Sequence, residues 1–167
     1  MNRHIKKVAI LGSGVMGSRI ACHFANVGCE VLLLDILPKE PNDAEKAKGL
    51  TIDSKPVRNR IVNEALQFAL TSNPSPIYRK SFASRIKTGN FEDDMAKIAD
   101  VDWIIEVVIE RLDIKKQVFE NVEKFRKPGT LVSTNTSGIP IHLMLDGRSD
   151  DFKKHFAGTH FFNPPRY

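Results

Sequence analysis

The chain has 167 residues, of which 41% are hydrophobic and 27% are charged, and a chain of this size and composition can enclose one hydrophobic core. It contains no run of about 18 apolar residues and no apolar stretch after Met1, so we expect no membrane span and no secretion signal, and a cytoplasmic location is the default expectation. The 25 Lys and Arg residues outnumber the 20 Asp and Glu residues, but they are scattered along the chain. This charge favours a phosphorylated small molecule or an ordinary basic surface over a nucleic-acid partner. The spacing of Cys22 and Cys29 fits neither a redox pair nor a zinc site, and we expect no metal.

Residues 8–35 predict a strand, a helix and a second strand. The apolar run Val8-Ala9-Ile10-Leu11 stops at a glycine cluster, as a strand buried on both faces does. From Val15 the apolar residues follow helical spacing as far as Gly28, a residue type that commonly stands just beyond a helix. Residues 30–35 are again apolar up to a final Asp35, so the three segments predict a βαβ unit.

The stretch from about residue 40 to about residue 80 interrupts this alternation with prolines and two polar helical segments, near residues 43–54 and 57–70. Further along the chain we expect strands at 84–88, 103–108 and 130–133, a helix that starts at Asn90, and a helix at 112–125. Alternating strands and helices predict an α/β fold, a Rossmann-type doubly wound and mainly parallel sheet with an inserted helical pair. We expect a single domain over residues 1–167.

A glycine-rich motif lies at the junction of the first predicted strand and helix. Its six residues are Gly12, Ser13, Gly14, Val15, Met16 and Gly17, which match G-x-G-x-x-G. The pattern alone is weak, but a strand before it and a helix after it are the context that its mechanism requires. The first glycine permits a tight turn, the second lets a diphosphate approach the backbone, and the third lets the helix press on the strand. The motif therefore predicts a dinucleotide site at a helix N-terminus.

An acidic residue closes the second predicted strand at the distance that dinucleotide sites require. Asp35 follows the glycines by about 20 residues, where a carboxylate accepts hydrogen bonds from the hydroxyls of the adenosine ribose. The same carboxylate would repel a 2'-phosphate, unless Lys39 compensates. We therefore expect NAD rather than NADP as the cofactor.

Two further segments make the interpretation more specific. The first is Ser133-Thr134-Asn135-Thr136-Ser137-Gly138, and the second is Gly158-Thr159-His160-Phe161-Phe162-Asn163-Pro164. Together with the glycine motif and Asp35, they resemble the 3-hydroxyacyl-CoA dehydrogenase family over essentially the whole chain. The arrangement is similar to bacterial fatty-acid oxidation enzymes in which the dehydrogenase comes first and an enoyl-CoA hydratase-like domain follows. The resemblance implies oxidation of L-3-hydroxyacyl-CoA to 3-ketoacyl-CoA in β-oxidation.

The resemblance also implies roles for five residues. His160 matches the catalytic histidine that takes the proton of the substrate hydroxyl, and imidazole is the side chain suited to proton exchange near neutral pH. Ser137 matches a serine that hydrogen-bonds the substrate oxygen and lies near the nicotinamide, and Asn163 matches an asparagine near the cofactor. Glu110 and Lys115 match positions that contact the nicotinamide half, and the lysine position also contacts CoA. From the residues alone, a packed histidine, a helix-capping serine and a solvated Glu–Lys pair remain open alternatives.

Acyl-CoA is the expected substrate partner, and its contacts are the weakest part of the prediction. Four basic residues of the expected insertion could meet CoA phosphates or simply face solvent: Lys46, Lys48, Lys55 and Arg58. In the family, a glutamate several residues beyond the His-Phe-Phe-Asn-Pro motif orients the histidine, and most of the acyl pocket comes from a following helical domain. We expect both to lie beyond this chain. We therefore expect the isolated chain to bind NAD but to turn over poorly, and the full-length enzyme to form a homodimer. A CoA-independent relative of the gulonate or carnitine dehydrogenase type, or a non-catalytic NAD-binding module, remains an alternative.

Overall fold

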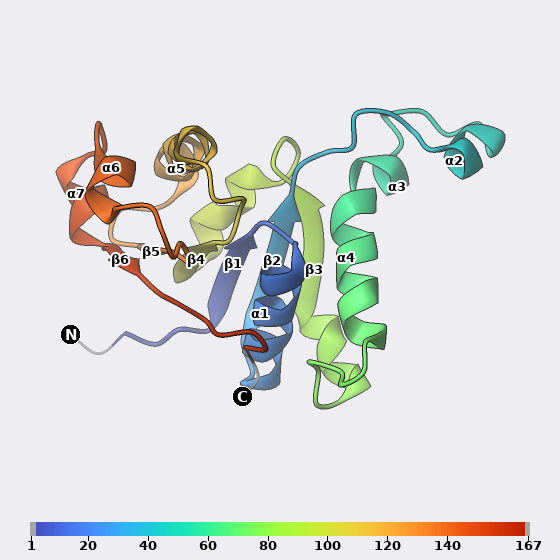
Figure 1. Cartoon of the computed structure of the whole chain (residues 1–167), viewed down its shortest axis with the longest axis horizontal. Coiled ribbons are helices and arrows are strands. Elements are labelled where there is room, and N and C mark those ends of the chain that lie inside the picture. Colours follow the sequence, from blue (N-terminus) through green and yellow to red (C-terminus); the bar gives the residue numbers. More distant parts are fainter. Residues whose placement is uncertain (1–2, 166–167) are drawn as a thin grey trace.

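Six parallel strands form one sheet in the order β3-β2-β1-β4-β5-β6 in the computed structural model, which describes residues 3–165 (Figure 1). The strands are β1 (Lys7–Leu11), β2 (Glu30–Asp35), β3 (Ile86–Asn90), β4 (Trp103–Glu106), β5 (Leu131–Thr134) and β6 (Phe156–Gly158). This order is the one found in dinucleotide-binding folds. It confirms the prediction of a Rossmann-type doubly wound sheet.

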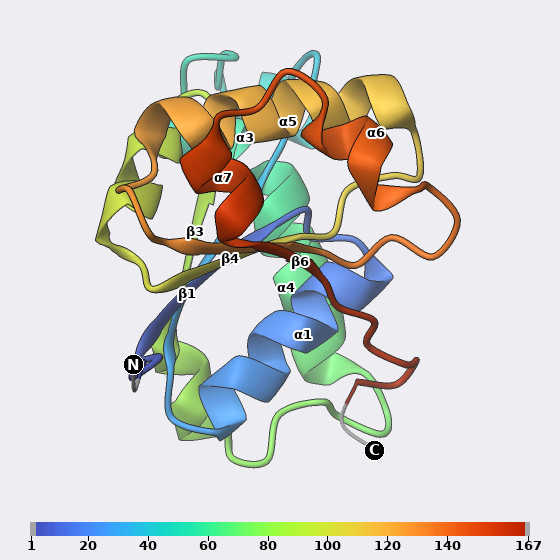
Figure 2. The ribbon, with the colours of Figure 1, turned by 90° about the vertical axis from the view of Figure 1, so that its left-hand side faces the viewer.

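Helices cover both faces of the sheet (Figure 2). The α-helices are α1 (Val15–Asn26), α2 (Asp43–Ala47), α3 (Lys55–Arg58), α4 (Arg60–Thr71), α5 (Leu112–Phe125), α6 (Ile141–Leu145) and α7 (Asp150–Lys154). Two 3-10 helices, η1 (Lys80–Arg85) and η2 (Met95–Asp100), precede β3 and β4. Figure 2 shows α1 and α4 below the sheet and α5, α6 and α7 above it. Within residues 3–165, no helix combines the length and the hydrophobicity that crossing a lipid bilayer would need.

Alternate residues along each strand supply two separate hydrophobic cores. Val8 and Ile10 of β1 pack with α1 and α4, whereas Ala9 and Leu11 pack with α5, α6 and α7. All four of these side chains are fully buried. A strand that is covered on both faces needs a continuous apolar run, and this explains why β1 could be predicted from the sequence.

The helical pair lies between β2 and β3, as predicted, but its two members differ. The helix predicted near residues 43–54 is shorter, because α2 ends at Ala47 and the chain then turns through Gly49, whose φ is +69°. The second member, α4, buries Val62 and Ala69 against the core that it shares with α1. Two parallel strands need a long crossover connection between them, and α4 provides it between β2 and β3.

Other boundaries differ from the sequence prediction by a few residues. The strand expected at 84–88 is β3, which runs to Asn90, so the helix start predicted at Asn90 is wrong. The Asn90 side chain does accept from the amides of Glu92 and Asp93, at 3.0 Å and 2.8 Å, but the 3-10 helix that follows begins only at Met95. The helices α6 and α7 and the strand β6 were not predicted.

The order of the strands reverses between β1 and β4. β1 pairs with β2 on one side and with β4 on the other, and the chain leaves β1 to cross toward β2. At such a switch point a crevice opens beyond the carboxyl ends of the strands, and ligands of open α/β sheets bind there. The carboxyl edge of β1, β4, β5 and β6 is therefore where the site is expected.

Candidate dinucleotide and substrate site

The glycine turn leaves β1 in a conformation that excludes side chains. Gly12 has a φ of +105°, and a Cβ atom built there would stand 2.7 Å from the carbonyl oxygen of Val107. Its amide donates to the carbonyl oxygen of Leu34 at 2.8 Å, which ties the turn to β2. The turn therefore lies against both neighbouring strands at the switch point.

The other two glycines of the motif have opposite surroundings. A Cβ atom at Gly17 would stand 1.8 Å from the carbonyl oxygen of Gly12, so the start of α1 presses directly on the turn. A Cβ atom at Gly14 would have nothing within 4 Å. The Ser18 amide donates to the Gly14 carbonyl at 3.0 Å, so α1 starts there and its first amides point along the helix axis toward this open space. The arrangement fits a diphosphate above Gly14.

Asp35 lies at the end of β2 and is bonded to the glycine turn. The amide and the hydroxyl of Ser13 both donate to its Oδ2 atom, at 2.6 Å and 2.5 Å, and the amide of Ile36 donates to Oδ1 at 2.7 Å. A carboxylate can accept about four hydrogen bonds, so capacity remains for a ribose hydroxyl. The structure therefore brings Asp35 and Ser13 together at the adenosine side of the expected site.

Glu110 holds the turn that follows β5. Its Oε1 atom accepts from the amides of Ser137 and Gly138, at 3.1 Å and 2.9 Å, and from the Thr136 hydroxyl. Burial would raise the pKa of this carboxyl, but these hydrogen bonds and the nearby Lys115 ammonium lower the pKa to about 2. Glu110 is therefore charged at any physiological pH.

Lys115 is almost fully buried, with 1% of its side chain exposed. Its ammonium lies 2.8 Å from Glu106, which is also buried, and 3.4 Å from Glu110. The predicted contact of Lys115 with CoA stays a prediction, because the ammonium points into the protein here.

Ser137 and His160 line one groove at the carboxyl edge of the sheet. The groove has a volume of about 450 Å³ and is walled by residues of the turns after β5 and β6, which are Thr136, Ser137, Gly138, Ile139, Pro140, Ile141, Gly158, Thr159 and His160. Ser137 and His160 are both exposed, and the His160 ring packs edge to face on the Phe162 ring, with the ring centres 5.5 Å apart. A hydroxyl and an imidazole therefore face a common space that is open to a substrate.

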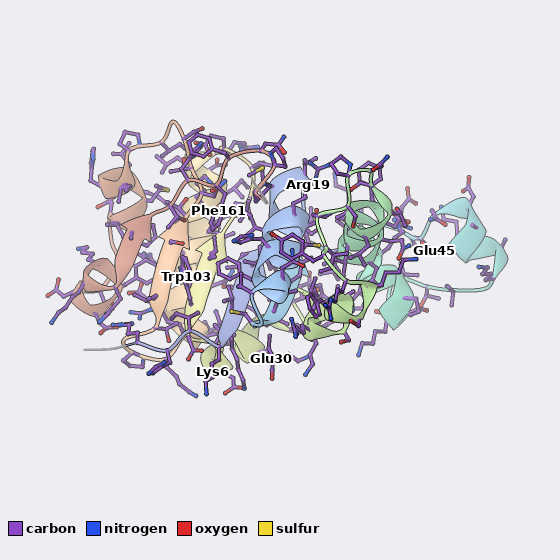
Figure 3. The ribbon with its side chains drawn as sticks, turned by 90° about the horizontal axis from the view of Figure 1, so that it is seen from below. Lys6, Arg19, Glu30, Glu45, Trp103 and Phe161 are labelled. Atoms are coloured by element: carbon purple, nitrogen blue, oxygen red, sulfur yellow. The ribbon has the colours of Figure 1, made fainter. Side chains whose placement is uncertain are left out.

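Asn163 does not line this groove. Its side-chain oxygen accepts from the guanidinium of Arg19 on α1 at 3.3 Å, and Phe161 packs on Phe24 of the same helix with the ring centres 6.1 Å apart. Figure 3 labels Arg19 and Phe161 beside α1. The Phe161 amide donates to the Asn135 side chain at 2.8 Å. The segment after His160 is thus laid along α1, and a cofactor contact of Asn163 stays a prediction.

Two of the four basic residues considered for CoA are already in ion pairs. Arg58 donates to Asp93 at 2.6 Å and to Glu92 at 3.0 Å, and Lys46 lies 3.2 Å from Glu40. A CoA phosphate would have to compete with these carboxylates.

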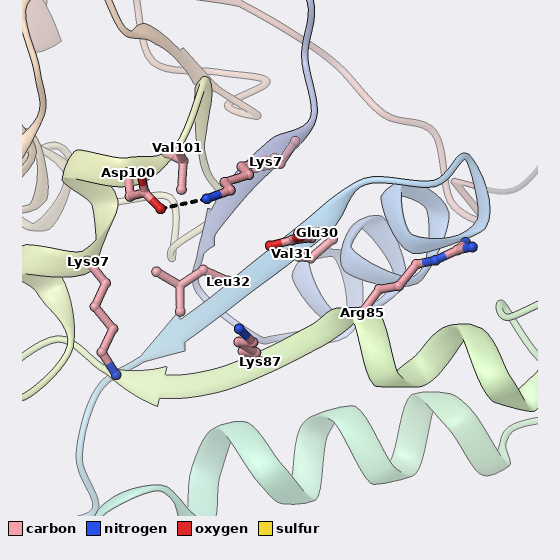
Figure 4. A pocket seen from close by; sticks show the side chains of 10 residues that line it. Lys7, Glu30, Val31, Leu32, Arg85, Lys87, Lys97, Asp100 and Val101 are labelled. Carbon is pink, nitrogen blue, oxygen red and sulfur yellow. Dashed lines mark hydrogen bonds and ion pairs between the residues drawn. The ribbon is translucent and has the colours of Figure 1, made fainter.

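A separate groove of about 260 Å³ lies beside β2 and β3 (Figure 4). The Lys7–Asp100 ion pair of 2.6 Å stands at its border, and Glu30 and Arg85 mark the amino-terminal ends of β2 and β3. This groove is at the opposite edge of the sheet from the glycine turn and is therefore separate from the candidate site.

A dinucleotide is the ligand that the carboxyl edge defines. The open space at Gly14, the helix N-terminus behind it and the Asp35 carboxylate fit the diphosphate and the ribose of such a molecule. Residues 7–167 match the model of the 3-hydroxyacyl-CoA dehydrogenase, NAD binding domain, and the chain belongs to this family. NAD is accordingly its cofactor.

Known proteins agree with this assignment. The chain is 54% identical over 167 residues to a Bacillus subtilis (strain 168) protein named "Probable 3-hydroxyacyl-CoA dehydrogenase", a match that covers 100% of this chain and 21% of that protein. A Deinococcus radiodurans protein of the same name is 45% identical over 98% of this chain and 43% of its own length. The structure of 3-hydroxybutyryl-CoA dehydrogenase from Escherichia coli K12 is similar with a TM-score of 0.66 and 29% identity, over 98% of this chain and 31% of that one. The chain thus spans less than half of each of these relatives.

The sequence did not single out Glu106, although the structure places it at the centre of the site's polar contacts. One signal was available, since Glu106 is the charged residue within the apolar run 103–108. A charge in a strand buried on both faces is costly and therefore needs partners.

Proposed function

We propose that the polypeptide that contains this chain oxidises L-3-hydroxyacyl-CoA to 3-ketoacyl-CoA in fatty-acid β-oxidation, with His160 as the general base. The observation that carries this proposal is the shared groove of Ser137 and His160, at the same edge of the sheet as the glycine turn. The names of the similar proteins, which include a 3-hydroxybutyryl-CoA dehydrogenase, support the substrate class.

Two side chains of this chain would have direct roles in the reaction. Bound NAD, held at Gly14 and Asp35, supplies a hydride acceptor for carbon 3 of the substrate. The hydroxyl on that carbon must lose its proton as the carbonyl forms, since otherwise positive charge would build on the carbon. A ring nitrogen of His160 would take this proton. The Ser137 hydroxyl would bind the same oxygen and hold it toward the ring.

We also propose that the 167-residue chain by itself binds NAD but turns over slowly. Within residues 3–165, the His160 ring has a contact with Phe162 but no hydrogen-bond partner. A general base works best when a second group fixes its orientation and a pocket holds the substrate in reach. The expected result is normal NAD affinity with a rate far below that of the complete enzyme, and a rate similar to the complete enzyme would contradict it.

The main test follows NADH formation by the complete polypeptide with 3-hydroxybutyryl-CoA and with free hydroxy acids. We expect oxidation of the CoA thioester, and we expect His160→Gln to reduce kcat by about 100-fold to 10,000-fold while the Kd for NAD changes little. His4→Gln is the matched control, because His4 borders a groove at the amino-terminal edge of the sheet. A preference for free hydroxy acids would overturn the substrate class, and an unchanged rate of His160→Gln would overturn the role of the histidine. NAD binding without turnover on either substrate would instead favour a non-catalytic module.

A further inference from the structure

Glu106 is a fully buried carboxylate at the end of β4, and two of the three partners of its side chain, Lys115 and Thr134, connect it to the turn that carries Ser137. Its Oε1 atom accepts from the Lys115 ammonium at 2.8 Å and from the Val108 amide at 2.7 Å, and its Oε2 atom accepts from the Thr134 hydroxyl at 2.5 Å. Both charged partners are at most 1% exposed. A buried ion pair is weak evidence for stability, because desolvation of two charges can cancel their attraction. The Glu106–Lys115 pair therefore suggests a role other than stabilising the fold.

The first connection from Glu106 to the site passes through Lys115. The ammonium that Glu106 holds lies 3.4 Å from the Oε2 atom of Glu110. The other oxygen of Glu110 accepts from the amides of Ser137 and Gly138. One oxygen of Glu110 is thus held by the buried lysine, so the other is directed at the turn that carries Ser137.

The second connection runs along the backbone after β5. The Thr134 hydroxyl, which donates to Glu106, also accepts from the Thr136 amide at 3.3 Å. The Asn135 amide donates to the main-chain carbonyl oxygen of Glu106 at 2.8 Å. Glu106 therefore holds the start of the 134–138 turn directly and the end of the turn through Lys115 and Glu110.

We propose that Glu106 is a positioning residue that fixes the Ser137 turn opposite His160. The turn is short and its serine is exposed, so its place in the groove depends on the bonds to its backbone. Each of the backbone amides of residues 135–138 has a partner in this network. Loss of the buried carboxylate would leave the Lys115 ammonium with two contacts of 3.4 Å, to the Val108 carbonyl oxygen and to Glu110, so the lysine, Glu110 and the turn could shift together. The consequence for turnover rests on the proposed function, whereas the effect on the turn does not.

The direct test measures amide hydrogen exchange by NMR in the 167-residue chain. We expect Glu106→Gln to speed exchange at the Ser137 and Gly138 amides by about 10-fold or more relative to the unmodified chain. The control is Asp151→Asn, which removes the charge from a 2.5 Å ion pair between the half-buried Asp151 and the buried Arg126, whose other hydrogen bonds go to the carbonyls of Lys127 and Thr130 before β5. It should leave both amides unchanged. Unchanged exchange in Glu106→Gln would overturn the proposal.

A second variant keeps the test decisive if Glu106→Gln folds poorly because it leaves Lys115 unpaired. The double variant Glu106→Gln with Lys115→Met removes both buried charges, and such replacement commonly restores stability. The proposal expects recovered thermal stability with exchange at Ser137 and Gly138 still fast. Restored protection of these two amides would show that Glu110 holds the turn without the buried pair, and it would overturn the proposal.

In the complete polypeptide, we expect Glu106→Gln to lower kcat for 3-hydroxyacyl-CoA by about 10-fold or more, with the KM for NAD changed less than about 3-fold. A merely destabilised enzyme would instead lose active concentration, so its kcat would return to the unmodified value when the rate is divided by the titrated concentration of NAD-binding sites, and Asp151→Asn reports that case. If the amides respond as expected but the unmodified polypeptide oxidises no hydroxyacyl-CoA, the proposed function fails and the positioning role of Glu106 stands. If kcat and amide exchange are both unchanged, the positioning role fails.

Discussion

Gly14 and Gly17 occupy equivalent-looking places in the motif, but they predict different outcomes when a methyl group is added. Gly17→Ala would force its Cβ against the Gly12 carbonyl oxygen at 1.8 Å, so we expect a loss of about 1–3 kcal/mol of stability. Gly14→Ala meets open space and should change the thermal midpoint little, but it should weaken NAD binding about 10-fold because the methyl group stands where the diphosphate approaches. Thermal unfolding and calorimetric titration of both variants measure the two effects. Equal loss of stability in the two variants would contradict this interpretation of the turn.

The Asp35 carboxylate has a structural role, because it accepts two hydrogen bonds from Ser13, and we predict that it also binds the adenosine ribose of NAD. We expect Asp35→Ala to weaken NAD binding by about 10-fold or more, since hydrogen bonds to a charged group are lost, and to weaken NADP binding less. Asp100→Ala, which breaks the Lys7 ion pair at the other edge of the sheet, is the control and should alter neither affinity. Calorimetric titration with both dinucleotides gives the comparison. Equal losses for NAD and NADP would show that the carboxylate does not discriminate between them.

At the scale of elements, the sequence could predict those parts of the fold whose burial is continuous. β1, β2, α1 and α5 have long apolar runs or clear helical periodicity, and all four were predicted within a few residues. The short elements α6, α7 and β6, of 5, 5 and 3 residues, are too brief for a periodic pattern. The helices α6 and α7 are stabilised by tertiary packing, as the fully buried Met144 and Phe152 show, and β6 is held by its pairing with β5.

The same limit applies to the site. The placement of the glycine motif, Asp35, Ser137 and His160 at one edge of the sheet could be predicted because each lies in a local motif, and their roles stay predictions. The contact between Glu106 and Thr134 could not be predicted, since the two residues are far apart in the sequence and meet only when β4 and β5 pair. The burial of Lys115 was hidden for the same reason.

The turn after β5 should respond to pH through Glu110. The pKa of this carboxyl is about 2 in the fold and 4.5 for an ordinary glutamate, so its bonds contribute stability that is present above about pH 4.5 and is lost as the pH falls toward 2. We expect Glu110→Gln to be less stable than the unmodified chain at about pH 5, and this difference to shrink by about pH 3. Urea unfolding at several pH values measures it. A difference that stays constant over this range would mean that the Glu110 charge does not stabilise the turn.

For the whole molecule, the predicted dinucleotide site is assembled from separate elements of one sheet. The turn after β1, the end of β2 and the turn after β5 belong to elements that contact each other through the two cores, so a ligand that bridges them should stabilise the domain as a unit. NAD at about 100 times its Kd should add about 2.7 kcal/mol, which corresponds to a rise of roughly 5–10 °C in the midpoint for a chain of this length. Differential scanning fluorimetry with increasing NAD tests this.

His160→Ala should keep the full shift in that experiment, because the imidazole lines the groove after β5 and β6, and neither Gly14 nor Asp35 lines that groove. Gly14→Ala and Asp35→Ala should show a smaller shift at the same NAD concentration. The first places a methyl group where the diphosphate approaches, and the second removes the carboxylate expected to bind the ribose. The three variants therefore show which residues NAD binding depends on, without any substrate. A shift that is lost in His160→Ala and kept in Gly14→Ala would place the dinucleotide away from the glycine turn, and the assignment of the carboxyl edge as its site would then be wrong.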